Sequence, residues 1–243
     1  MIRSIGVVMP ARDEEVLLPG AVAAVLAARA ELVRREPEWA EPGRVRIVVL
    51  LDACTDGSLA VARSFGSAIE VLELDAANVG RARAAGVDHV ISRSGEPGAC
   101  RDAGSTDARP GLWICTTDAD TVVPDHWLLD HLQAARDGAE LAVGRVVPRA
   151  ADMDPALLAA WRREHEGAGR HVYGANLGIR ADVYRAVGGF SSLRVGEDVE
   201  LVRAAEERGA VVLDLPFSVV QTSGRREGRT PGGFAGYLRT LAD

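Results

Sequence analysis

Two aspartates, Asp118 and Asp120, follow directly on the apolar run at residues 112–117. Because side chains alternate along an extended chain, two carboxylates at this spacing after a strand can project toward one crevice. Hard divalent cations such as Mg²⁺ and Mn²⁺ prefer oxygen ligands of this kind. The spacing therefore predicts a cation site, and the alternative is a plain polar turn ahead of Pro124.

A second acidic turn, at residues 10–15, follows the apolar run at residues 5–9. Acids at the start of a helix favour the positive end of its dipole, and this explanation is enough for Glu15. The turn still places a carboxylate, Glu14, at the same edge of the sheet as Asp118 and Asp120. We therefore expect Glu14 to face the same pocket.

A third acidic turn begins with Asp52, the residue that ends the apolar run at residues 45–51. An acidic side chain at that position can bond a base or a ribose at the edge of the sheet, so we favour ligand binding for Asp52. Asp56 precedes a predicted helix and is assigned to helix capping. Three such turns at one edge predict one shared pocket.

Asp198 lies in Gly196-Glu197-Asp198, immediately before an amphipathic stretch. The local pattern makes it a helix N-cap, and the second interpretation is a general base toward a substrate hydroxyl. The histidines show no metal-ligand spacing. Only His171 is kept as a site candidate, because it directly precedes residues 172–176, a segment that is itself expected to line the site.

Arg225, Arg226 and Arg229 lie in a loop that contains glycine and proline. Guanidinium groups can clamp a diphosphate through paired hydrogen bonds, which makes Arg225 and Arg229 candidates for diphosphate binding. An exposed arginine-rich loop without a ligand is the equal alternative.

The composition narrows the function classes. The 28 basic residues are all arginine, so phosphate loops and Schiff-base mechanisms that need a lysine are excluded. A net charge of −7 and a pI near 5.3 disfavour nucleic acid and anionic lipid as partners, and favour a small nucleotide. The length of 243 residues fits one domain.

The cysteines Cys54, Cys100 and Cys115 are far apart and odd in number, which favours a reducing, cytoplasmic setting. No apolar run reaches the roughly 18 residues of a membrane-spanning helix. We expect no transmembrane segment, although contact with a membrane surface stays open.

Apolar runs and amphipathic stretches alternate, which predicts an α/β fold with a mostly parallel central sheet flanked by helices. Residues 93–111 carry no periodicity and are predicted to form an exposed loop. The expected strands are residues 5–9, 45–51, 69–74, 112–117, 141–147, 172–179 and 211–215. The expected helices are residues 15–36, 57–65, 79–92, 124–137, 155–166, 198–208 and 234–241.

Seven segments, taken in order, resemble the family 2 glycosyltransferases of the GT-A fold. They are residues 8–14, 51–58, 78–86, 117–120, 174–180, 187–190 and 196–201. The resemblance covers nearly the whole chain. It implies a Rossmann-like GT-A domain over residues 1–243 with a smaller acceptor-side C-terminal portion. Residues 1–120 would form the nucleotide-binding half and residues 121–243 the acceptor-binding half.

The resemblance also implies a role for each matching residue. Asp120, together with Asp118, would hold a Mg²⁺ or Mn²⁺ ion at the diphosphate of a nucleotide sugar, and Asp198 would deprotonate an acceptor hydroxyl in one inverting displacement. The implied donor-binding residues are Pro10, Ala11, Glu14, Asp52, Arg81 and Asp118, and the implied acceptor-binding residues are Gly174, Ala175, Asn176 and Glu197.

Two positions depart from the family pattern: Asp13 stands where asparagine is common, and no histidine follows the last strand at residues 221–223. The metal site is therefore expected to be sparser than in many relatives. Two other functions remain open. One is a haloacid-dehalogenase-like phosphatase, since Asp118-Ala119-Asp120-Thr121-Val122 also fits its motif, and the other is a nucleotide-sugar-binding protein without activity. The acceptor and the oligomeric state are not indicated by the sequence.

Overall fold

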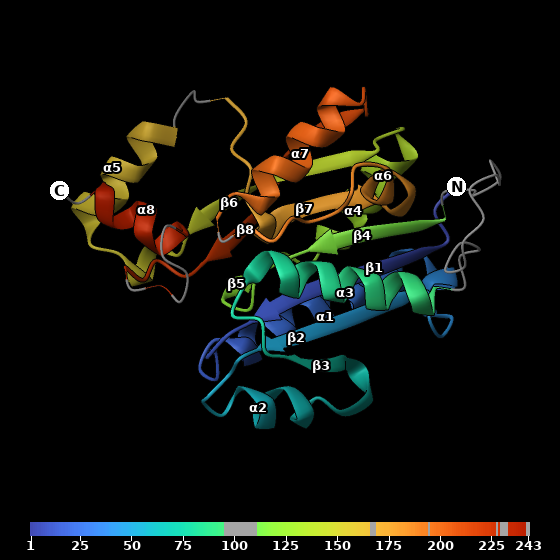
Figure 1. Ribbon diagram of the computed structural model, residues 1–243, viewed down its shortest axis with the longest axis horizontal. Helices are drawn as coiled ribbons and strands as arrows, with labels where there is room; N and C mark the ends of the chain where they lie inside the picture. Colours follow the sequence, from blue (N-terminus) through green and yellow to red (C-terminus); the bar gives the residue numbers. More distant parts are fainter. Residues whose placement is uncertain (95–110, 166–168, 194, 227, 229–232, 242–243) are drawn as a thin grey trace.

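The computed structural model describes residues 1–94, 111–165, 169–193, 195–226, 228 and 233–241. Its centre is an eight-stranded sheet with the order β3-β2-β1-β4-β7-β6-β8-β5 (Figure 1). The strands are β1 (Ser4–Ala11), β2 (Val45–Asp52), β3 (Glu70–Leu74), β4 (Leu112–Thr116), β5 (Thr121–Val122), β6 (Leu141–Pro148), β7 (Leu177–Arg180) and β8 (Val212–Thr222).

The first four neighbours, β3, β2, β1 and β4, are all parallel. Strand β7 is antiparallel to both β4 and β6, while β8 pairs parallel with β6 and antiparallel with the short β5. The α/β class with a mostly parallel sheet is therefore confirmed. In the parallel part, the carboxyl ends of β1, β2 and β4 lie at one edge of the sheet, where a ligand crevice is expected.

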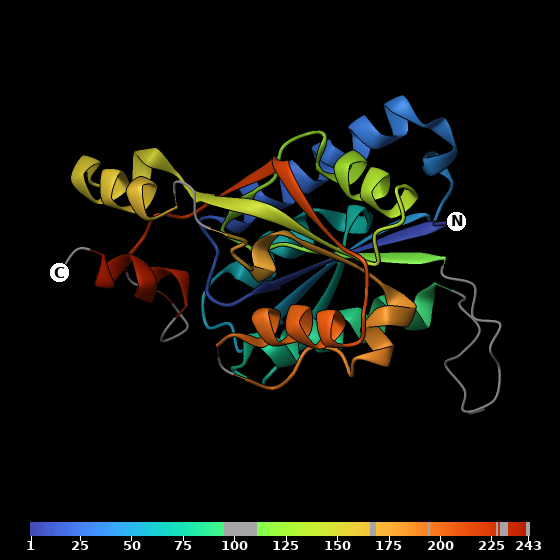
Figure 2. The ribbon, with the colours of Figure 1, turned by 90° about the horizontal axis from the view of Figure 1, so that it is seen from above.

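Helices cover both faces of the sheet (Figure 2). They are α1 (Leu18–Arg35), α2 (Ser58–Ser64), α3 (Val79–Arg93), α4 (Trp127–Arg136), α5 (Pro155–His165), α6 (Ala181–Ala186), α7 (Glu197–Glu207) and α8 (Phe234–Thr240). Within the described residues, no helix is both long enough and apolar enough to span a bilayer.

The alternation of β1 explains the two-sided core. Val7 and Met9 pack in one hydrophobic cluster with residues of α1 and α4, whereas Val8 packs in a second cluster with residues of α3 and α7. A strand covered on both faces needs apolar side chains at successive positions, which is why these strands appear in the sequence as unbroken apolar runs. A third, smaller cluster joins α5 to α8 through Trp161 and Leu238.

The first half of the chain follows the predicted alternation closely, although α1 begins at Leu18 because Glu14 and Glu15 belong to the preceding turn. The predicted loop at residues 93–111 falls almost entirely outside the described residues.

The second half differs in four elements. Residues 174–176 form one 3₁₀ turn, so β7 starts only at Leu177, and β8 continues through Pro216 to Thr222 instead of ending at Leu215. The register between β6 and β8 shifts at Gly144 and Arg145, opposite the proline, and this irregularity lets the strand continue. Neither β5 nor α6 was predicted, because both are too short to show a period.

His131 of α4 is fully buried between the rings of Trp113 and Trp127. Its Nε2 lies 3.3 Å from Oδ1 of Asn176, which also accepts the Trp127 indole N–H. That oxygen is an acceptor, so Nε2 carries the imidazole proton, and Nδ1 has no partner in the described structure. Burial therefore lowers the pKa of His131 to about 4.

We predict that His131 makes the protein less stable in acid. Its pKa is lower in the folded than in the unfolded chain, so protonation favours unfolding, and stability falls as the pH drops from 6.5 toward 4. The shift from 6.5 to about 4 corresponds to about 3 kcal/mol. Urea unfolding should show that the free energy of unfolding falls less between pH 7 and pH 4.5 for His131→Gln than for the wild type. His126→Gln, at an exposed residue, serves as the control. An equal fall in all three proteins contradicts the prediction.

Candidate active site

A cavity of about 400 Å³ opens at the carboxyl ends of β1, β2 and β4. The three acidic turns that the sequence places at this edge do share it, together with residues that come from the second half of the chain. The predicted site residues that line the cavity are Pro10, Ala11, Glu14, Asp52, Asp118, Asp120, Gly174, Ala175, Glu197, Asp198 and Arg225.

Two predicted contacts need correction. Asn176 is fully buried below the cavity, where its amide donates to the carbonyl oxygens of Arg145 and Ser218, so it is not placed to touch an acceptor. Arg81 is exposed on α3 and does not line the cavity. The third candidate, Arg229, lies outside the described residues.

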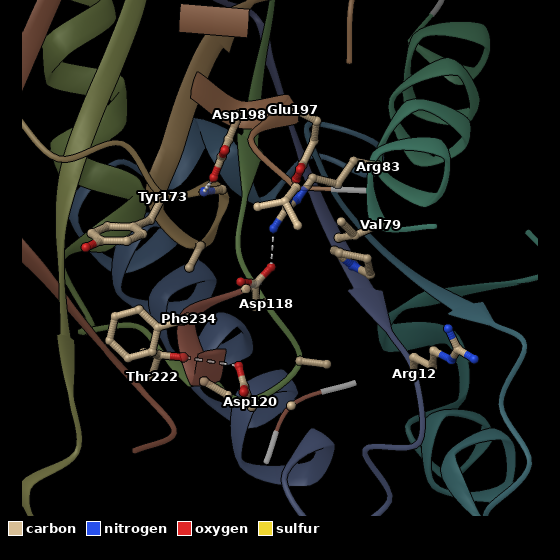
Figure 3. Close-up of a pocket in the computed structure, with 18 of the residues that line it drawn as sticks. Arg12, Val79, Arg83, Asp118, Asp120, Tyr173, Glu197, Asp198, Thr222 and Phe234 are labelled. Atoms are coloured by element: carbon tan, nitrogen blue, oxygen red, sulfur yellow. Dashed lines mark hydrogen bonds and ion pairs between the residues drawn. The ribbon is translucent and has the colours of Figure 1, made fainter. Parts of the chain in front are cut away.

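On α3, the arginine that lines the cavity is Arg83, which the sequence analysis missed. Its guanidinium is buried and bonds the carboxylates of Glu197 and Asp118 (Figure 3). It also lies over the ring of Phe190. The helical period contained the signal, because residue 83 precedes the buried Val87 and Val90 by four and seven positions. Arg83 thus joins a strand end of the first half to the start of α7.

Asp52 is almost fully buried at the end of β2. Its two carboxylate oxygens accept hydrogen bonds from the backbone N–H groups of Ala76, Ala77 and Asn78, at 2.7, 2.8 and 2.7 Å. These bonds hold Ala77 at a positive φ of 49° and set the start of α3, where Asn78 is the N-cap. Asp52 therefore shapes one wall of the cavity, and its predicted contact with a ligand stays a prediction.

Asp13 and Asp56 belong to the acidic turns at this edge but do not line the cavity. Asp56 accepts the backbone N–H of Ser58, the first residue of α2, but the N-cap is Gly57, so the predicted capping role of Asp56 is wrong, and Glu15 accepts from Gly57. Glu15 therefore serves α2, whereas the sequence analysis had assigned it to the start of α1. Asp13, Cys54 and Asp56 form the one group of three metal-ligand side chains within 4.8 Å in the described part of the chain. Asp13 and Asp56 already accept backbone N–H groups, so this group braces two turns.

Asp120 lies deep in the cavity, with 16% of its side chain exposed. One oxygen accepts a hydrogen bond from the hydroxyl of Thr222 at 3.2 Å, and the other lies 3.1 Å from the guanidinium of Arg225. Burial, and then the nearby charge of Asp118, raise the pKa of Asp120 to about 6, although Arg225 opposes this shift. Thr222 lies in residues 221–223, the segment whose lack of a histidine predicted a sparser metal site.

Asp198 lies in the first turn of α7, on the opposite side of the cavity from Asp120 (Figure 3). The N-cap of this helix is Gly196, whose φ of 83° suits glycine, so the predicted capping role of Asp198 is wrong. One of its carboxylate oxygens accepts the backbone N–H of Gly174 at 2.6 Å and the other accepts that of Val199 at 2.8 Å. These bonds fix the carboxylate at the cavity.

Aromatic side chains form the wall next to Asp198. Tyr173 and Phe234 meet edge to face with ring centres 5.7 Å apart (Figure 3). The ring centre of Tyr237 lies 6.4 Å from that of Phe234. The sequence analysis did not find this wall, because α8 is far from Tyr173 in the chain. His171 is exposed and lines a neighbouring cavity of about 440 Å³, so it is not part of the main site.

Residues 6–187 match the model of glycosyl transferase family 2. The chain belongs to this family. The match confirms the resemblance that the motifs suggested, and it contains Asp52, Asp118 and Asp120. A comparison with curated proteins finds no sequence match.

Solved structures share the fold of this chain. The chain resembles S. aureus TarS 1-349 in complex with UDP, at 12% identity and a TM-score of 0.61, over 91% of this chain and 61% of that one. It also resembles the mannosyltransferase PcManGT from Pyrobaculum calidifontis in complex with GDP-Man and Mn²⁺, at 16% identity and a TM-score of 0.62, over 94% and 59%. At these identities the likeness establishes the GT-A fold, and the chain spans only about three fifths of each structure.

A third structure is covered more fully. Glucosyl-3-phosphoglycerate synthase from Mycobacterium tuberculosis, in complex with Mn²⁺, UDP and phosphoglyceric acid, matches at 17% identity and a TM-score of 0.55, over 99% of this chain and 76% of that one. The family model ends before Asp198 and Arg225, so their roles depend on the geometry of this family member alone.

We predict that Arg83→Met destabilises the protein by about 3–5 kcal/mol, because it leaves Glu197 buried without its partner cation. Urea unfolding at neutral pH measures the effect. Arg81→Met is the matched control on the same helix: its side chain is exposed, and the substitution should change the free energy of unfolding by less than about 0.5 kcal/mol. Equal losses in both variants contradict the assigned role of Arg83.

Proposed function

We propose that this chain transfers a sugar from a nucleotide-diphosphate sugar to an acceptor hydroxyl, with inversion at the anomeric carbon and with a divalent cation. The observation that carries the proposal is the meeting of carboxylates from three strand ends in one cavity, with Asp198 across from them. The family match supports glycosyl transfer, and TarS with UDP and PcManGT with GDP-Man and Mn²⁺ support a nucleotide-sugar donor.

The donor belongs, in this proposal, to the half formed by residues 1–120, where Pro10, Ala11, Glu14 and Asp52 lie around the base and the ribose. Arg225 faces the diphosphate, and residues 121–243 provide the acceptor side. One related structure is in complex with UDP and another with GDP-Man, so the proposal is not restricted to one base or one sugar.

Asp120, with Asp118 as the second ligand, fits Mg²⁺ or Mn²⁺. The two aspartates supply hard carboxylate oxygens. Burial and the nearby charge of Asp118 raise the pKa of Asp120 although Arg225 opposes the shift, so a further positive charge at this carboxylate is favourable. A cation bound there neutralises the charge that develops on the departing diphosphate. Thr222 donates a hydrogen bond to one Asp120 oxygen, and the other oxygen faces the guanidinium of Arg225.

Asp198 is the proposed general base. It accepts the proton of the acceptor hydroxyl as the oxygen of that hydroxyl forms a bond to the anomeric carbon and the bond from that carbon to the diphosphate oxygen breaks. The electron pair of the broken bond leaves with the nucleoside diphosphate. The N–H of Gly174 orients the carboxylate, and a single displacement inverts the configuration.

The acceptor lies, on this proposal, between Asp198 and the wall of Tyr173 and Phe234, over the backbone of Gly174 and Ala175. Aromatic faces of this kind pack well against the body of a polyhydroxylated ring. Glu197 acts on this side through its ion pair with Arg83 and not through direct contact.

The surroundings of the protein are also proposed. The free thiols of Cys54 and Cys115 fit a reducing, cytoplasmic setting, and the net charge of −7 disfavours nucleic acid as a partner. Contact with a membrane surface remains compatible with this proposal.

Two other functions are separated from this one by simple assays. A haloacid-dehalogenase-like phosphatase would release phosphate from simple phosphoesters, and the ion pair between Asp118 and Arg83 disfavours Asp118 as its nucleophile. A nucleotide-sugar-binding protein without activity would bind the donor but neither transfer nor hydrolyse it.

We predict that UDP or GDP raises the melting temperature of the protein only when Mn²⁺ or Mg²⁺ is present. A nucleotide at a hundred times its Kd stabilises the fold by about 2.7 kcal/mol, which is a shift of several degrees. Asp120→Asn should abolish the shift, whereas the exposed Asp125→Asn should retain it. An equal shift in chelator contradicts the role of Asp120.

We predict that Asp198→Asn lowers kcat for transfer by about 10²- to 10⁴-fold, because the proton of the acceptor hydroxyl loses its base. Nucleotide binding, measured by calorimetry with Mn²⁺, should stay within about threefold of the wild type. Proton NMR of the fresh product should show the anomeric configuration opposite to that of the donor. Retention of configuration, or wild-type kcat in the variant, excludes the single displacement with this base.

A further inference from the structure

Arg225 makes the most telling contact in the cavity. Its guanidinium donates to both carboxylate oxygens of Glu14, from Nη1 at 2.7 Å and from Nη2, and Nη2 also lies 3.1 Å from Asp120. The three side chains come from distant parts of the sequence and are 25%, 7% and 16% exposed, respectively. One arginine thus pairs with two carboxylates in the cavity.

The contact occupies the oxygen that the proposed cation needs. Thr222 takes one oxygen of Asp120, and the guanidinium faces the other. A divalent cation at that oxygen would stand beside a second positive charge in a poorly solvated place, where like charges repel strongly. Cation and guanidinium therefore compete for Asp120.

The second arginine of the cavity, Arg83, behaves differently. It is 4% exposed, bonds Asp118 and Glu197, and packs beside Phe190, so it is fixed in the wall. Arg225 follows the end of β8 and its guanidinium lines the cavity, where a diphosphate can reach it. A guanidinium pairs with phosphate oxygens as well as with a carboxylate.

We propose that Arg225 exchanges partners: it holds Glu14 and Asp120 while the donor is absent, and it moves to the diphosphate when the donor binds. This inference rests on the proposed function. The exchange frees Asp120 for the cation at the moment when the nucleotide arrives. Cation and nucleoside diphosphate then bind cooperatively, because Arg225 has to leave Asp120 only once for both ligands.

Such coupling is reciprocal, so the nucleotide tightens cation binding by the same factor as the cation tightens nucleotide binding. Removing the guanidinium should separate the two effects. Without Arg225, Asp120 loses a competing charge and binds a cation alone more tightly, while the diphosphate loses a partner and binds more weakly. If Arg225 only braced the site, its removal would weaken the binding of both ligands. If Arg225 only bound the diphosphate, its removal would leave cation binding unchanged.

The test is a titration of the full chain with Mn²⁺, following the signal of free Mn²⁺ by electron paramagnetic resonance, with and without UDP or GDP. Arg225→Gln should bind Mn²⁺ alone about tenfold more tightly than the wild type. The same variant should bind the nucleotide in the presence of Mn²⁺ about tenfold more weakly, and the factor by which nucleotide tightens Mn²⁺ should shrink. Arg226→Gln, at the exposed neighbouring residue, should match the wild type in each titration.

The outcomes separate the two proposals. If the nucleotide binds with Mn²⁺ but Arg225→Gln leaves the affinity for Mn²⁺ alone unchanged or weaker, the exchange is wrong and the proposed function stands. If neither nucleotide binds the wild type with Mn²⁺ or Mg²⁺, the proposed function fails and the exchange fails with it. Should Arg225→Gln not fold, Arg225→Lys keeps the charge without the paired geometry. That variant should weaken nucleotide binding and leave Mn²⁺ binding within threefold of the wild type, and wild-type nucleotide binding in it overturns the exchange.

Discussion

The site depends on keeping several carboxylates close together in a poorly solvated cavity. Glu14, Asp118, Asp120 and Glu197 would repel one another there, and burying a carboxylate without a partner is costly. Two guanidinium groups make the arrangement possible: Arg83 pairs with Asp118 and Glu197, and Arg225 pairs with Glu14 and Asp120. Because the chain has no lysine, arginine supplies both partners, and its planar fork can bond two acids at once.

The parallel strands determine where these acids meet. Strands β1, β2 and β4 are neighbours or near neighbours with the same direction, so the residues after each one arrive at the same edge. Asp52 shows that position alone does not decide a role. It reaches this edge as the others do, but it binds three backbone N–H groups and shapes the loop before α3. A carboxylate at a strand end can therefore build the pocket wall without an arginine.

The sequence was sufficient to predict which residues meet at the carboxyl ends of the strands. It was insufficient to predict which side chains from other elements contact them. Unbroken apolar runs mark buried parallel strands, so the meeting of Glu14, Asp52 and Asp120 in one cavity followed from strand ends alone. The choice between Arg81 and Arg83 depended on which face of α3 meets the sheet, and a motif match carries no such information. Asn176 was wrongly assigned to the acceptor for a similar reason, because its partners come from β6 and from beyond the proline of β8.

The two sides of the cavity differ in how their residues are held, and this difference bears on what each side recognises. On the side proposed for the donor, Asp118 and Asp120 follow a central strand whose neighbours are packed on both faces, so their positions tolerate little change. On the other side, Tyr173 follows a segment without regular structure, and Phe234 belongs to α8, whose own cluster is separate from the main core. Relatives can alter such a wall without disturbing the sheet. A fixed donor side beside a replaceable aromatic wall is the arrangement expected of a fold that keeps one chemistry and changes its acceptor.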